Sequence, residues 1–307
     1  MRRSGTTKFQ NSVQLFKFCQ KVLSEIKGGK INDQAVGAIL NFNPSDCSHW
    51  KRGEKNIKSI FSLEKLAKEL GLEISLIHDL TSGSITVDEA YFEFSEANNY
   101  QRTIKQAKLA HPQGYQEVRK TITNFTSFLL KQSNFNTPPL YLPEVLRFFP
   151  FISLQPVEIL DKLSRILRIK KGSYIIQFKK GELKPQTRMS IIKDVAKILF
   201  EGERERYPQL GARREALVNV EKLLFTAELL APKQLLISET TKSEARQNII
   251  AEQAALFWVP KSLICFQLQE ILLHEQTSKT SSQAETLRGG VYTEPLQGAT
   301  RNDAQLR

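Results

Sequence analysis

Histidine and cysteine, the side chains most used for metal binding and nucleophilic catalysis, are few and widely spaced in this chain. The histidines are His49, His78, His111 and His274, and the cysteines are Cys19, Cys47 and Cys265. No two histidines lie four residues apart, so no helix presents a paired imidazole site for zinc. The cysteines have neither metal-ligand spacing nor the even number of a disulfide framework, which favours a reducing cytoplasm. The sequence also lacks a Gly-rich phosphate loop and the Gly-x-Ser-x-Gly elbow of serine hydrolases.

Near the N-terminus, the residue types are those that build two short helices around a tight turn. Asn32-Asp33 can cap a helix that runs through residue 40. Asn43 can cap a second helix over residues 44–52, and Pro44 suits its first position, where an N–H has no helical partner. Two short helices joined by a turn of about three residues are typical of a helix-turn-helix.

The second of these helices has side chains that suit a DNA major groove, where the N-terminal residues of a helix reach base edges. Helical periodicity places Ser45, Asp46 and His49 on the exposed face, and Cys47 and Trp50 on the core face. An acid facing DNA repels phosphates, so Asp46 is expected either to accept from a cytosine amino group or to turn away. The basic residues at and after the helix end are expected to meet phosphates. The predicted DNA-contacting set is Gln34, Ser45, Asp46, Ser48, His49, Lys51, Arg52, Lys55 and Lys58.

Three blocks of sequence follow in order: 48–55 (Ser-His-Trp-Lys-Arg-Gly-Glu-Lys), 63–72 (Leu-Glu-Lys-Leu-Ala-Lys-Glu-Leu-Gly-Leu) and 77–80 (Ile-His-Asp-Leu). Over residues 12–80 they resemble the XRE family of phage-repressor-like DNA-binding domains. The resemblance implies a five-helix domain whose recognition helix carries the serine and the aromatic residue of the first block. Residues 33–40 depart from the family's usual Gln-x-x-Leu-Ala pattern, which bears on the phosphate contact implied at Gln34.

The second half of the chain predicts a strand at 173–178 followed by buried helices at 189–200 and 216–230. This order, with the sequence Phe-Thr-Ala-Glu-Leu-Leu-Ala-Pro at 225–232, resembles the ImmA/IrrE family of metallopeptidases over residues 140–273. In that family, a His-Glu-x-x-His helix holds zinc with two imidazoles one turn apart and uses the glutamate as general base.

The positions that correspond to this zinc motif are occupied by Lys193, Asp194 and Lys197. Two ammonium groups on one helix face repel a cation, and a carboxylate without a metal-activated water has no reaction to catalyse. Glu221 is the nearest candidate for the family's acidic third ligand. We therefore expect no zinc, no other cofactor and no peptidase activity. Glu221 or Glu228 is expected to pair with one of the lysines, leaving a pocket suited to a small anionic effector.

Composition and periodicity give a broader outline of the chain. It has 307 residues and a formal net charge of +12, which suits a polyanionic partner but is weak evidence alone. No apolar run reaches the roughly 18 residues of a membrane helix, so no membrane partner is expected. Further helices are predicted by apolar periodicity. They lie at 13–26, at 157–169, at 251–272 and, as a pair broken at 111–114, within 84–133.

The fold class predicted is mainly α with a small β component. The predicted parts are a helix-turn-helix domain at 1–83, a helical linker at 84–137, a degenerate ImmA/IrrE-like domain at 138–275 and a disordered tail at 276–307.

The function predicted is a cytoplasmic, sequence-specific regulator of transcription that binds double-stranded DNA as a homodimer, with contacts from residues 84–273. Its inactive peptidase-like domain would serve self-association or the sensing of a small-molecule or protein effector. Three alternatives remain open. One is a metallopeptidase with a rebuilt metal site that acts on a repressor. Another is an antitoxin-like protein-interaction module, and the third is a helix-turn-helix retained only for packing or dimerisation.

Overall fold

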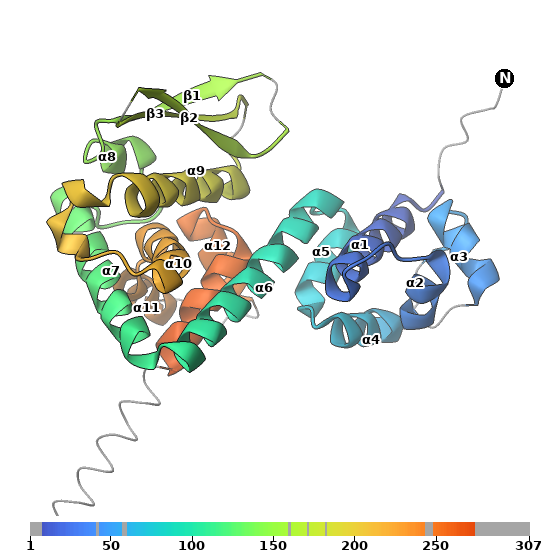
Figure 1. Ribbon diagram of the computed structural model, residues 1–307. Helices are drawn as coiled ribbons and strands as arrows, with labels where there is room; N and C mark the ends of the chain where they lie inside the picture. The colour runs from blue at the N-terminus through green and yellow to red at the C-terminus, as the bar shows by residue number, and fades with distance from the viewer. Residues whose placement is uncertain are drawn as a thin grey trace, which may run out of the picture. The chain divides into compact units, whose positions relative to one another are not determined.

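The computed structural model describes residues 8–40, 43–56, 60–158, 161–170, 172–181, 183–242 and 248–273. Their fold is mainly α with one three-stranded sheet, which confirms the predicted fold class (Figure 1). Packing divides the chain into two compact units, Met1–Gln267 and Leu268–Arg307. Only residues 268–273 of the second unit are described, so the fold below is that of the first. The tail expected to be disordered, 276–307, lies outside the described residues.

Five helices form the N-terminal part of the fold. They are α1 (Gln10–Lys27), α2 (Asp33–Leu40), α3 (Pro44–Lys51), α4 (Ile60–Leu70) and α5 (Ile74–Ser82). One apolar core joins them, and α1 supplies Leu15, Phe16 and Phe18 to it, each fully buried. The predicted helix at 13–26 is confirmed by α1, which ends at Gly28 with a left-handed φ of 69° that glycine adopts without strain.

Two long helices follow, α6 (Val87–Ala110) and α7 (Pro112–Gln132), and confirm the predicted break at 111–114. A capping box begins α6: the backbone N–H of Glu89 donates to the Thr86 hydroxyl, and the backbone N–H of Thr86 donates to the Glu89 carboxylate. Pro112 ends the continuous helix because proline has no N–H to donate, and it becomes a first-turn residue of α7.

The sheet has the strand order β1-β3-β2 and packs against α9 (Pro185–Lys197). Strands β1 (Ile152–Val157) and β3 (Ser173–Lys179) are parallel, whereas β2 (Ser164–Lys170) is antiparallel to β3. The strand predicted at 173–178 is confirmed by β3. The helix predicted at 157–169 is wrong, since those residues include the end of β1 and most of β2. Their apolar spacing suits either structure, and hydrogen bonding to β3 selects the strand.

Helix α10 (Val218–Leu230) is nearly all buried and packs on α7 and α9. The remaining elements are α8 (Leu142–Leu146), a π-helical turn at Ile198–Gly202, α11 (Lys233–Lys242), α12 (Ile249–Phe257) and a last helix at Lys261–Leu273. The helices predicted at 189–200 and 216–230 are confirmed. The helix predicted at 251–272 is instead two helices, because the chain turns at Trp258, which has a left-handed φ of 53°.

No single helix of the described chain is long and apolar enough to span a membrane. Only α12 and the last helix together reach that length and hydropathy, and they meet at a bend of 112°.

Candidate functional site

The side chains on one face of helix α3, the predicted DNA-reading element, pack into the core and hold the helix in place. Pro44 occupies the first turn after Asn43, and Gly53, with a left-handed φ of 69°, follows the helix end. Trp50 is 1% exposed and Cys47 is 2% exposed, and both belong to the core shared with α1 and α4. The prediction that these two residues face the core is therefore confirmed. Burial raises the pKa of the Cys47 thiol, with the nearby Asp33 and Asp46 adding to the effect.

Two of the predicted DNA-contacting residues on the other side of α3 share one acidic partner, Glu54. His49 Nδ1 lies 2.5 Å from Glu54 Oε2, and Arg52 Nε lies 3.1 Å from Glu54 Oε1. Arg52 Nε also donates to the backbone carbonyl of Ser48 at 3.2 Å. His49 and Arg52 keep 42% and 59% of their side-chain surface exposed, so solvent reaches both.

Two lysines near α3 also carry acidic partners. Lys51 Nζ lies 3.1 Å from Asp33 Oδ2, at the first turn of α2, and Lys55 pairs with Asp46. Asp46 therefore turns toward a lysine of its own chain, which is one of the two outcomes expected for an acid at this position. Ion pairs at this exposure are worth only about 0–1 kcal/mol each, so a phosphate can replace the carboxylate at little cost.

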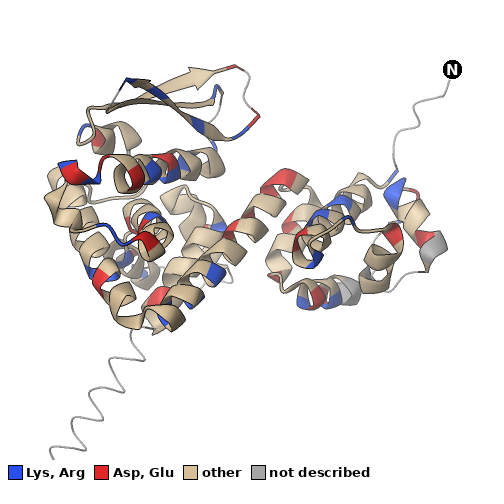
Figure 2. Ribbon diagram, viewed as in Figure 1, with Lys and Arg blue, Asp and Glu red and all other residues tan. Residues whose placement is uncertain are grey.

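The structure describes some of the remaining predicted DNA-contacting residues but not others. Gln34 and Ser48 are exposed, on α2 and α3 respectively. Ser45 lies in α3, but its side chain is outside the described residues, as is the whole of Lys58. Figure 2 shows Lys and Arg interleaved with Asp and Glu over the N-terminal helices, so the charge around α3 is mixed rather than uniformly basic.

The three residues that the resemblance matched with a zinc motif, Lys193, Asp194 and Lys197, lie on α9, and the first two are bound by other side chains of the fold. Lys193 Nζ donates to both carboxylate oxygens of Glu96 on α6, at 2.6 and 2.7 Å. Asp194 Oδ2 accepts from the hydroxyl of Ser164 on β2 at 2.6 Å. Burial raises the pKa of the Asp194 carboxyl, although the Ser164 hydrogen bond and the lysines beside it act in the opposite direction. Lys197 is exposed.

The expected pairing of a glutamate on α10 with a lysine on α9 does not occur. Glu221 is 2% exposed and receives both terminal nitrogens of Arg204, each at 2.7 Å. Glu228 lies 2.9 Å from Lys233 Nζ instead. The physical reason is the orientation of Glu221, whose carboxylate faces the segment that follows α9. Arg204 lies in that segment and also donates to the backbone carbonyls of residues 210, 211 and 212.

Sequence reasoning missed the partners that fix these groups, namely Glu96, Ser164 and Arg204. Of these three, only Arg204 has a feature in the local sequence that could have pointed to its role. It belongs to a run of alternating charges at 203–206 that precedes a buried helix. Among the described residues, no group of three or more His, Cys, Asp or Glu side chains is arranged to hold a metal ion.

Comparison with known proteins adds no family to this geometry. No protein-family model matches the chain, and neither a curated protein nor a solved structure matches it.

Proposed function

We propose that this protein is a sequence-specific regulator of transcription that binds double-stranded DNA through a helix-turn-helix formed by α2 and α3. The observation that carries the proposal is the two-sided character of α3. Trp50 and Cys47 anchor one side in the core, while His49 and Ser48 stand on a side that solvent reaches. A short helix fixed in this way is the element that enters a major groove.

In this mechanism, polar side chains of α3 contact base edges. Ser45 and Ser48 can donate or accept, whereas His49 can donate to a purine N7 or O6. Asp46, which pairs with Lys55, is not among these base contacts. These contacts supply preference between sequences.

Phosphate contacts supply most of the affinity in the same mechanism. Lys51, Arg52 and Lys55 are each at least half exposed, and each exchanges a carboxylate partner for a phosphate oxygen. This exchange releases condensed counterions from the DNA, which makes binding fall as salt rises. The released carboxylates of Asp33, Asp46 and Glu54 oppose the approach of DNA and so keep nonspecific binding weak.

The domain that contains α9 and α10 is proposed to be catalytically inactive and to serve self-association or sensing. What supports this is that Lys193, Asp194 and Glu221 are each engaged by another side chain, so none is left as a ligand or base. A homodimer is proposed because one helix-turn-helix covers a single half-site. Light scattering of the full chain, alone and with DNA, tests it, and a monomer under both conditions contradicts it.

The experiment that tests DNA reading is selection of bound duplexes from a random pool by the full chain. A recurring sequence, with a two-fold repeat if the protein is a dimer, is the expected result. Recovery of unenriched sequence at every round contradicts the proposal. Metal analysis of the purified protein tests the inactive domain: zinc retained at about one equivalent after dialysis against a weak chelator would favour a rebuilt peptidase site.

A further inference from the structure

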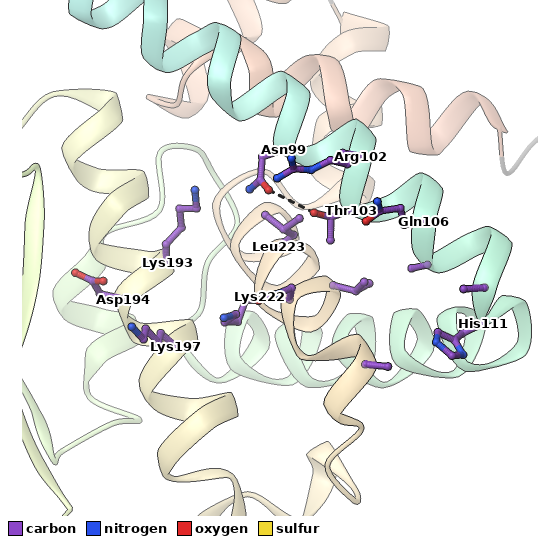
Figure 3. Close-up of a pocket in the computed structure, with 15 residues that line it drawn as sticks. Asn99, Arg102, Thr103, Gln106, His111, Lys193, Asp194, Lys197, Lys222 and Leu223 are labelled. Atoms are coloured by element: carbon purple, nitrogen blue, oxygen red, sulfur yellow. Dashed lines mark hydrogen bonds between the residues drawn. The ribbon is translucent and has the colours of Figure 1, made fainter. Parts of the chain in front are cut away.

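A cavity of about 700 Å³ lies between α6, α9 and α10, beside the positions of the absent zinc motif (Figure 3). Lys193, Asp194 and Lys197 contribute to its wall, whereas Glu221, the expected third ligand, does not. Its volume falls in the range of about 300–1,000 Å³ that is usual for small-molecule sites. A duplex about 20 Å wide cannot enter such a cavity, so the feature suits a small ligand rather than DNA.

The wall of this cavity is strongly basic. Arg102 comes from α6, Lys193 and Lys197 come from α9, and Lys222 comes from α10, while Asp194 is the only acid in the wall. The Asp194 carboxylate points away from α10 in Figure 3 and accepts the Ser164 hydrogen bond described above. Its hydrogen bond is therefore made on the sheet side of α9.

The four cations are not equally available to a ligand. Lys193 is bound to Glu96, and Lys222 Nζ lies 2.5 Å from Glu201 Oε1. Within the part of the chain that the structure describes, the side chains of Arg102 and Lys197 form no hydrogen bond and no ion pair. Both are exposed, and the charge of Lys197 acts on the neighbouring Asp194 carboxyl, whose pKa it lowers, without a hydrogen bond or ion pair between them.

Neutral hydrogen-bonding groups complete the wall. Asn99, Thr103 and Gln106 follow one face of α6, and Asn219 faces them from α10. Thr103 Oγ1 donates to Asn99 Oδ1 at 3.3 Å, which leaves the Asn99 amino group for a ligand (Figure 3). His111, at the junction of α6 and α7, lines the far end. The cavity therefore offers a ligand two cations that form no hydrogen bond or ion pair, Arg102 and Lys197, beside amide and hydroxyl groups.

We infer that this cavity binds a small organic polyanion, with Arg102 and Lys197 holding its oxyanion groups. A guanidinium presents paired N–H donors that match a carboxylate or a phosphate, and an ammonium adds a point charge. Lys193 and Lys222 are each neutralised by a carboxylate partner and are not assigned a ligand contact. The inference does not depend on DNA reading by α3, because the cavity is formed only by elements that follow residue 86.

Titration calorimetry of the full chain tests the inference, with pyrophosphate as the phosphate probe and citrate as the carboxylate probe at constant ionic strength. We expect at least one probe to bind with a dissociation constant of about 1 mM or lower. The double variant Arg102→Ala/Lys197→Ala should weaken that binding by about tenfold or more, since two charge-assisted contacts are removed.

Matched controls separate a specific site from general attraction to a basic protein. The variant Lys105→Ala/Lys120→Ala removes two exposed charges from α6 and α7, neither of which lines the cavity, and should bind the probe as the parent does. Arg102→Lys keeps the charge and should lose less affinity than Arg102→Ala. Absence of binding by both probes, or equal loss in the Lys105/Lys120 control, overturns the inference whether or not the protein binds DNA.

Discussion

The basic side chains of α3 and those beside α10 carry acidic partners alike, but they differ in exposure. Lys51, Arg52 and Lys55 keep 54%, 59% and 50% of their side-chain surface in contact with solvent. Arg204 and Glu221 keep only 9% and 2%. The first set can therefore exchange partners at little cost, whereas the second cannot be separated without leaving a charge in the interior.

This difference assigns the two regions different roles. Around α3, exposed ion pairs keep the basic side chains at the surface, where a phosphate can replace the carboxylate. Removing one such basic side chain should therefore alter binding more than stability. Around α9 and α10, the ion pairs are buried or half-buried, so removing one should alter stability first. Variants on either side of this division should therefore differ in which property they change.

Glu221→Ala should cause the largest loss of stability. It leaves Arg204 buried without its carboxylate partner, and breaking a buried pair on one side costs about 3–5 kcal/mol. Urea denaturation followed by circular dichroism measures the change. Glu54→Ala, which breaks the exposed pairs of His49 and Arg52, is the control and should cost less than about 1 kcal/mol. Equal losses in the two variants would remove the distinction between the regions.

Lys193→Met should have a smaller effect, because the Lys193 side chain is 30% exposed. It leaves the carboxylate of Glu96, itself 11% exposed, without the cation that donates to both oxygens. We expect a loss of about 2 kcal/mol, within the range for a charged hydrogen bond. The double variant Lys193→Met/Glu96→Met should recover much of it, since both charges are gone. A double variant as unstable as the sum of the single ones contradicts the pairing.

Arg52→Ala/Lys55→Ala should leave stability nearly unchanged and weaken binding to all duplex sequences alike. Loss of two phosphate contacts is expected to lower affinity by about tenfold and to reduce the slope of log affinity against log salt by about 2. Fluorescence anisotropy over a range of salt concentrations measures both. Lys68→Ala, an exposed charge on α4, is the control. An unchanged salt dependence in the double variant argues against phosphate contact at these residues.

Asp194→Asn should give the smallest effect, visible as a change in pH dependence. Burial raises the pKa of Asp194 in the folded chain above its unfolded value, so ionisation is more costly when folded. Its contribution to stability is therefore most favourable below about pH 4 and is lost as pH rises through the folded pKa. Relative to the variant, the parent should lose stability as pH rises through this range. A constant difference between parent and Asp194→Asn contradicts this assignment.

The parts of the fold predicted well from sequence are those set by local residue chemistry. Asn32 caps α2, because its side chain accepts from the backbone N–H of Ala35 at 2.9 Å. Pro112 breaks α6 from α7, and the periodicity of α3 places Trp50 in the core. Each of these outcomes depends on neighbours within about one helical turn, which the sequence displays directly.

The parts that sequence did not predict depend on distant residues. Strand β2 forms because β3 supplies its hydrogen bonds, and an isolated reading of 157–169 favours a helix. Lys193 and Glu96 are 97 residues apart, and Lys261 pairs with Asp79 across 182 residues. The packing of the helices decides which carboxylate pairs with which basic side chain. The pairing of Glu221 with a lysine of α9, expected from the sequence, is wrong for this reason.

The most direct test of the central claim, that α3 reads DNA sequence, is a selection experiment on Ser45→Ala/His49→Ala beside the parent. The account predicts that the parent enriches a recurring sequence and that the variant loses most of this preference. The variant should still bind random duplex DNA with nearly the parent's affinity and salt dependence, because its phosphate contacts remain. A variant that enriches the same sequence to the same degree would contradict base reading by α3.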